Sequence, residues 1–153
     1  MKLADILDKS YIIPALNARS KKELIDEMTS SLARNNPTID KEKLVQVILE
    51  REKLGSTGIG DGIAIPHGKL TGLDHMILSF GRSAKGIDFE SMDGKPSHLF
   101  FLLVVPENSV GIHLKALATI SRLLKKNSFR ESLLKTDDPD AIHQLIIHKD
   151  EEF

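Results

Sequence analysis

One stretch near the middle of this 153-residue chain holds the side chains best suited to chemistry. It begins at Arg51, runs through four glycines between positions 55 and 62, and ends in Pro66-His67-Gly68. A histidine with an ordinary pKa of about 6.5 is neutral near pH 7 and offers a ring nitrogen lone pair. Such a nitrogen can attack phosphorus, so His67 is a candidate acceptor of a phosphoryl group.

The residues beside His67 favour a ring that is fixed in direction and open to a second protein. Pro66 restricts the backbone just before the histidine. Gly68 removes bulk just after it, which predicts room for another active site to approach closely. Phosphoryl transfer depends mostly on positioning and on stabilising the phosphoryl oxygens, so both features suit that chemistry.

The loop before His67 offers groups that bind anions. Its glycines allow backbone N–H groups to converge on a phosphate, and Ser56 and Thr57 add hydroxyl donors. We therefore predict phosphate contacts from Ser56, Thr57 and Gly58. Arg51, at the end of the preceding predicted helix, supplies a guanidinium suited to phosphate.

The same pattern also fits a plain turn between a helix and a strand. The loop is not a Walker A sequence, because no Gly-Lys-Ser/Thr closes it. It is not a dinucleotide fingerprint, because its glycines follow a helix and precede a strand. Local spacing therefore leaves both the phosphate site and the plain turn open.

Helical patterns lie on both sides of this segment. Residues 20–34 form the first, with a capping-box pattern at Ser20 and Glu23, and Asp40 caps a second that stops near Gly55. Three more helices are predicted towards the C-terminus: residues 111–126, a short one capped by Ser128 and Glu131, and one opened by Asp138-Pro139.

Short apolar runs between these helices predict strands. Residues 63–66 are short and extended, residues 76–80 form another strand, and residues 99–105 are continuously apolar, as in a strand buried on both faces. Helices before and after a few strands indicate an α/β layered domain in which helices cover the sheet.

Composition excludes several other classes of protein. The net charge of −1 gives no basic field for nucleic acid, and the absence of cysteine excludes thiolate chemistry and fits a reducing cytoplasm. The longest apolar run, residues 99–105, is too short to cross a bilayer, and the first residues lack a signal peptide. We therefore expect a cytoplasmic protein without membrane insertion.

No His-Glu-x-x-His or similar pairing appears, so no metal site is expected.

His113 is a second candidate for the site. It lies in the first turn of a predicted helix, where free N–H groups and the helix dipole favour an anion. Its spacing to Leu117 and Ile120 also fits a partly buried histidine bonded to a nearby carbonyl. The residues alone leave both interpretations open.

The segment from Arg51 to Leu70 closely resembles the active-site region of type-2 IIA proteins of the bacterial sugar phosphotransferase system, the fructose/mannitol class. The matching residues are Glu52, Ile59-Gly60 and the run from Ile63 to Gly68. The amino-acid sequence of the loop is most similar to that of the nitrogen-regulatory branch of the family. The resemblance implies one domain over residues 1–153, with a mixed central β-sheet flanked by helices on both faces.

The resemblance also implies roles and partners. His67 would be the phosphohistidine, through Nε2, with Arg51 as a phosphate-side cation and His113 facing the site. The protein would act as a phosphotransferase component without a cofactor. An HPr-like carrier would donate the phosphate, and targets of the branch such as potassium transporters and sensor kinases would read the phosphorylation state.

Three alternatives remain at this point. A sugar-specific IIA component would instead pass phosphate to a IIB domain during fructose or mannitol import. A pure binding module would never be phosphorylated on His67, and a metal-dependent hydrolase would need bound metal.

Overall fold

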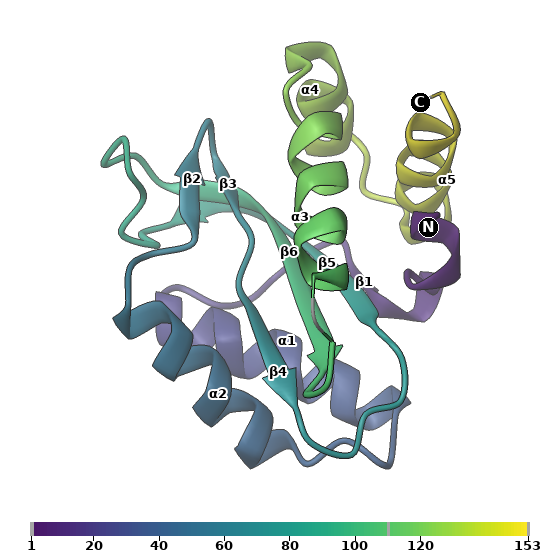
Figure 1. Ribbon diagram of the computed structural model, residues 1–153. Coiled ribbons are helices and arrows are strands. Elements are labelled where there is room, and N and C mark those ends of the chain that lie inside the picture. Colours follow the sequence, from purple (N-terminus) through teal and green to yellow (C-terminus); the bar gives the residue numbers. More distant parts are fainter. Residues whose placement is uncertain (1, 110, 153) are drawn as a thin grey trace.

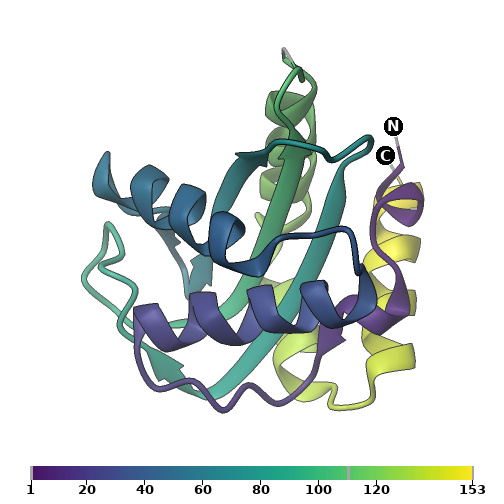
Figure 2. The ribbon, with the colours of Figure 1, turned by 90° about the horizontal axis from the view of Figure 1, so that it is seen from below.

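The computed structural model describes residues 2–109 and 111–152 as a mixed β-sheet between two layers of helices (Figure 1). The first two long helices cover one face of the sheet and the last three cover the other, as a second view makes plain (Figure 2). This arrangement confirms the predicted α/β fold with helices on both faces. The helices are α1 (Lys21–Asn35), α2 (Lys41–Lys53), α3 (Ile112–Leu123), α4 (Asn127–Lys135) and α5 (Pro139–Glu151), with short 3-10 turns η1 (Leu3–Asp5) and η2 (Lys9–Tyr11).

The sheet has the order β1-β5-β6-β3-β2, and β4 pairs with β6 as well. β6 runs antiparallel to β5 and parallel to β3 and β4. β1 is parallel to β5, and β2 is antiparallel to β3. The strands are β1 (Ile12–Ile13), β2 (Gly58–Gly60), β3 (Ile63–Ala64), β4 (His67–Leu70), β5 (Ile77–Ile87) and β6 (Ser97–Pro106).

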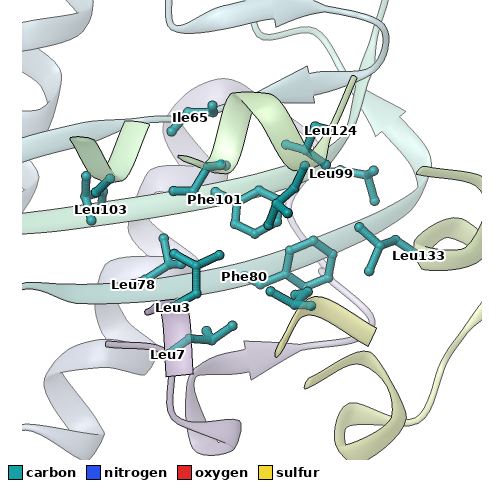
Figure 3. Close-up of a cluster of buried hydrophobic side chains, with 14 of the residues drawn as sticks. Leu3, Leu7, Ile65, Leu78, Phe80, Leu99, Phe101, Leu103, Leu124 and Leu133 are labelled. Atoms are coloured by element: carbon teal, nitrogen blue, oxygen red, sulfur yellow. The ribbon is translucent and has the colours of Figure 1, made fainter. Parts of the chain in front are cut away.

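β6 is the centre of the core, because its side chains alternate between the two helical layers. Leu99, Phe101, Leu103 and Val105 pack towards α3, α4 and α5, whereas Phe100, Leu102 and Val104 pack towards α1 and α2. Figure 3 shows the first of these clusters, in which the Phe80 and Phe101 ring centroids lie 4.9 Å apart. The prediction of a strand buried on both faces is confirmed.

β3 and β4 form one strand that is interrupted at Pro66. Ile63 pairs with Leu99 and His67 with Leu103, so both pieces keep the same register on β6. Proline has no N–H to donate, although its carbonyl still accepts from the Leu103 N–H at 3.0 Å. His67 is therefore the first residue of β4, held in line with the central strand.

Most predicted helix starts are confirmed by their caps. Ser20 accepts from the N–H of Glu23 at 3.2 Å, and Asp138 accepts from that of Ala141 at 2.9 Å. The predicted cap at Ser128 is wrong. The N–H groups of Phe129 and Arg130 both bond to the Lys126 carbonyl, so the first turn of α4 already closes at Lys126.

Candidate functional site

The hydrogen bond of His67 fixes which ring nitrogen is free. Nδ1 lies 2.9 Å from the carbonyl oxygen of Ile65. A carbonyl can only accept, so Nδ1 carries the proton and the lone pair of the neutral ring lies on Nε2. Nε2 bonds to none of the described residues, and it is not among the buried atoms that lack a partner. The nucleophilic nitrogen is therefore open to an incoming group.

The surroundings of His67 keep its ring neutral at pH 7. Burial is the largest cause that lowers the pKa of His67 below the ordinary 6.5, and electrostatic repulsion from Arg51 and His113 lowers this pKa further. The bond to Ile65 and the negative charge of Glu52 act in the opposite direction but do not outweigh burial. A neutral imidazole is the form that can attack phosphorus.

His67 opens onto a cavity of about 380 Å³. Three predicted site residues meet there from three different elements: His67 from β4, Arg51 from α2 and His113 from α3. The other lining residues are Val47, Glu50, Leu54, Gly68, Lys69 and Val105. The cavity thus combines a nucleophile, cations and an apolar wall.

Arg51 lies in the last turn of α2 and is half-buried. Its Nη1 donates to the Gly55 carbonyl at 3.0 Å, the one hydrogen bond that it makes to a described residue. A guanidinium carries five N–H donors, so most of them stay available to a phosphate.

His113 is the second residue of α3, in the first turn after the N-cap Gly111. Gly111 has a φ of +80° and provides no side-chain acceptor for the helix N–H groups. The Nδ1 atom of His113 is buried and has no hydrogen-bond partner among the described residues. Its Nε2 atom likewise has no hydrogen bond to a described residue, so the alternative of a histidine bonded to a nearby carbonyl is not observed within residues 2–109 and 111–152.

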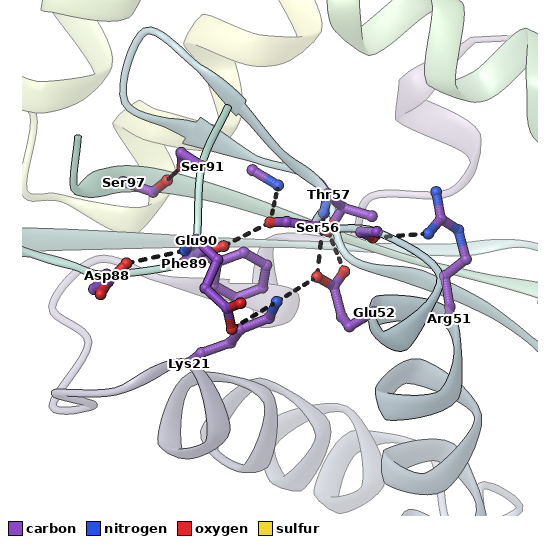
Figure 4. Close-up of polar contacts among 12 residues, drawn as sticks. Lys21, Arg51, Glu52, Ser56, Thr57, Asp88, Phe89, Glu90, Ser91 and Ser97 are labelled. Carbon is purple, nitrogen blue, oxygen red and sulfur yellow. Dashed lines mark hydrogen bonds and ion pairs between the residues drawn. The ribbon is translucent and has the colours of Figure 1, made fainter. Parts of the chain in front are cut away.

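The structure does not bring the three predicted loop residues to the cavity. The Ser56 hydroxyl donates to the Phe89 carbonyl at 2.6 Å, and Thr57 donates through both its N–H and its hydroxyl to Glu52 (Figure 4). Gly58 is buried, and a Cβ there would lie 2.5 Å from the Ser91 hydroxyl. The geometry thus gives no support to phosphate binding by this loop, whose small and polar residues are used for packing and internal bonds.

Gly68 has a structural role beyond the one expected. A Cβ at this position would lie 3.1 Å from Val47 Cγ2, so the glycine allows α2 to pack closely against β4. Gly68 also lines the cavity, and the expectation that it leaves space for a partner stays a prediction. The packing partner is the protein's own helix, and this contact is what brings Arg51 near His67.

Lys69 is a cation at the cavity that the sequence analysis missed. Alternation along β4 places Lys69 on the same side of the strand as His67. The signal was hidden because β4 was not predicted as a strand, since of its four residues only Leu70 is fully buried.

Within residues 2–109 and 111–152, no three His, Asp or Glu side chains are grouped so that they could hold a metal ion. None of the helices described is both long and apolar enough to cross a bilayer.

Comparisons with known proteins show the family to which this chain belongs. Residues 5–149 match the family described as phosphoenolpyruvate-dependent sugar phosphotransferase system, EIIA 2. The chain belongs to this family, whose members are phosphotransfer components. The resemblance noted from the segment between Arg51 and Leu70 is confirmed.

Relatives of two kinds match almost the whole chain. A nitrogen regulatory protein of Bradyrhizobium diazoefficiens is 43% identical over 147 residues, covering 95% of both chains. The fructose-specific EIIABC component of Bacillus subtilis is 39% identical over 98% of this chain. This chain spans only 24% of that longer protein.

Solved structures share the fold. The nitrogen regulatory protein IIA-Ntr of Neisseria meningitidis superposes with a TM-score of 0.88 at 35% identity, covering 94% of this chain and 98% of its own. The mannitol IIA enzyme of Escherichia coli, solved in complex with phosphorylated IIB, has a TM-score of 0.76 over 92% of this chain and 98% of its own. At 22% identity, that second similarity concerns the fold alone.

Proposed function

We propose that this protein is a phosphocarrier and regulatory protein of a nitrogen-type phosphotransferase system that accepts phosphate on His67. An HPr-like carrier donates the phosphoryl group from its own phosphohistidine in the cytoplasm. The observation that carries the proposal is the bond from His67 Nδ1 to the Ile65 carbonyl, because it leaves a neutral Nε2 facing the cavity with Arg51 and His113.

The transfer step follows from that geometry. The Nε2 lone pair of His67 attacks the phosphorus, and the bond between phosphorus and the donor nitrogen breaks. Its electron pair returns to the donor ring, which carries a proton on its other nitrogen and so becomes neutral. The proton on His67 Nδ1 stays bonded to the Ile65 carbonyl, and the phosphorylated ring of His67 takes over the positive charge that the donor ring has lost. Arg51 and, beside it, His113 stabilise the charge on the phosphoryl oxygens. One phosphorus–nitrogen bond replaces another, so the transfer is nearly isoenergetic and reversible.

Phosphorylation then acts as a signal through charge. It adds about two negative charges at one point on the surface, which is enough to admit or exclude a partner protein. The similarity to nitrogen regulatory proteins supports this regulatory output. Potassium transporters and sensor kinases are the targets that we propose by analogy with that branch.

A sugar-specific role is the second candidate, because the fructose-specific relative is nearly as similar. In that role His67 would pass its phosphate to a IIB domain. Mixing the phosphorylated protein with a IIB domain of the fructose or mannitol type separates the two, since only a sugar-specific IIA would lose its phosphate rapidly.

The proposal is tested by incubating the protein with phosphoenolpyruvate, enzyme I and an HPr-like carrier. We expect an acid-labile mass gain of one phosphoryl group, and no gain in His67→Ala. A protein that gains no phosphate from any competent donor would be a binding module instead. A gain that persists in His67→Ala would move the acceptor to another residue.

A further inference from the structure

Glu52 lies next to Arg51 in the last turn of α2 but points to the interior. Its side chain is only 4% exposed, which is unusual for a carboxylate and requires compensating partners. The proposed transfer chemistry uses Arg51 and leaves Glu52 without a role. Its contacts suggest one.

Three donors converge on the Glu52 carboxylate (Figure 4). The Thr57 N–H donates at 3.1 Å, the Thr57 hydroxyl donates to the other oxygen, and the Lys21 ammonium lies 2.9 Å away. Lys21 is itself held in place, because it lies 4.8 Å from the centre of the Phe89 ring and 3.6 Å from Glu90. The carboxylate therefore fixes Thr57 against the first turn of α1.

The turn between Glu52 and Thr57 packs loosely, and hydrogen bonds hold it at both ends and at Ser56, whose hydroxyl donates to the Phe89 carbonyl at 2.6 Å. Leu54 is 85% exposed, and a Cβ at Gly55 would meet nothing within 4 Å. The Gly55 N–H donates to the Glu52 carbonyl at 3.1 Å, Thr57 bonds to the Glu52 side chain, and the Thr57 carbonyl accepts from the Ile65 N–H at 3.0 Å. Only Ser56 separates Gly55 from Thr57, so we expect a shift of Thr57 to displace the backbone at Gly55.

The Gly55 carbonyl is in turn the acceptor that holds the Arg51 guanidinium, at 3.0 Å. A chain of contacts therefore runs from Lys21 and Glu52 through Thr57 and Gly55 to Arg51. Displacement of a charge-stabilising group by about 1 Å can slow a reaction by as much as about a hundredfold.

We propose that Glu52, held between Lys21 and Thr57, is a positioning residue for phosphoryl transfer: it fixes the Gly55 carbonyl, which aims the Arg51 guanidinium at the phosphate on His67. This inference rests on the proposed function for its effect on rate. The contact from Gly55 to Arg51 exists before any phosphate arrives, so the positioning itself is open to separate measurement.

Thr57→Val is the most informative variant. It removes the hydroxyl bond to Glu52 but keeps the negative charge of Glu52. That charge also raises the pKa of His67, so a substitution of Glu52 itself would change two properties at once. Thr57→Ser keeps the hydroxyl donor. Thr29→Val is the matched control, because Thr29 is also buried and its hydroxyl bonds to the Ile25 carbonyl, away from the cavity.

We expect Thr57→Val to lower the maximal rate of phosphate uptake about tenfold, with the half-saturating donor concentration unchanged. Thr57→Ser and Thr29→Val should keep the wild-type rate. In an Arg51→Ala background, Thr57→Val should change the rate by less than about twofold, because the group that it positions is gone. An unchanged rate in the single variant, or an undiminished tenfold loss in the Arg51→Ala background, would overturn the proposal.

An NMR measurement without any donor separates this inference from the proposed function. Bonding to Gly55 should slow the rotation of the Arg51 guanidinium in the wild type, and Thr57→Val should restore fast rotation. Identical Arg51 signals in the two proteins would refute positioning by Thr57, whether or not His67 accepts phosphate. Failure of the wild type to take up phosphate, with the Arg51 signals still different, would instead refute only the proposed function.

Discussion

Arg51 and Glu52 are neighbours in sequence and carry opposite charges, yet α2 presents them to opposite environments. The Arg51 guanidinium faces the cavity and makes one hydrogen bond to the described residues, whereas the Glu52 carboxylate is buried and receives three donors. A rotation of about 100° per residue on a helix suffices for this separation. The cation is left with free donors for a ligand, and the carboxylate is fully engaged in the fold.

The difference shows that two charged residues at one helix end can have separate roles, one in binding a ligand and the other in stabilising the fold. A group that must bind a transient anion is useful only if its donors are not already occupied. A buried carboxylate is tolerated only if its oxygens are occupied. Substitutions on the two sides should therefore affect different observables.

The largest effect is expected on the buried side, in folding stability. Glu52→Ala leaves the Lys21 ammonium and the Thr57 N–H without their partner, which should reduce the free energy of unfolding by about 3 kcal/mol. Urea unfolding measures this loss. Glu42→Ala, an exposed position on the same helix, should cost no more than about 0.5 kcal/mol. Equal losses in the two variants would show that Glu52 has no special structural role.

The second effect is expected for a substitution at the cavity, and it concerns the rate of phosphate uptake alone. Arg51→Ala should slow phosphate uptake by at least about tenfold, while the free energy of unfolding changes by less than about 0.5 kcal/mol. Lys53→Ala serves as the control, because Lys53 is exposed in the same helical turn and does not line the cavity. A variant of Arg51 that unfolds easily but reacts at the normal rate would reverse the comparison.

The smallest effect is a pH dependence of stability that originates at His67. Its folded-state pKa is lowered, so between that pKa and 6.5 the unfolded chain binds more protons than the folded one. The stability that His67 contributes is therefore present above pH 6.5 and is lost as the pH falls towards the folded pKa.

Urea unfolding of the wild type and of His67→Gln between pH 5 and pH 8 isolates this contribution. The wild type should lose more stability than the variant as the pH falls. Arg51→Ala should reduce the difference, because removing a nearby positive charge raises the pKa of His67. A wild type that gains stability relative to His67→Gln on acidification would contradict the lowered pKa.

The parts of the fold that depend on local sequence patterns could be predicted from the sequence. The caps at Ser20 and Asp138 and the continuous apolar run of β6 were predicted correctly, because capping and two-sided burial leave clear signatures. β4 and the far half of β5 were missed. Both contain exposed or glycine residues, and their pairing depends on β6, which is distant in sequence.

The site shows the same division. Arg51, His67 and His113 were predicted to meet, and the structure places all three on one cavity. The loop hydroxyls were not predictable in the same way, since Ser56 and Thr57 suit a phosphate and a buried carbonyl or carboxylate equally well. Only the fold reveals that Phe89 and Glu52 are within reach of them.

The most direct test of the account is to locate the phosphorus on the histidine ring. Nitrogen-15 NMR of the phosphorylated protein should show coupling to phosphorus at Nε2 of His67, with the proton still on Nδ1 and bonded to the Ile65 carbonyl. Phosphorus at Nδ1, or on any residue other than His67, would contradict it.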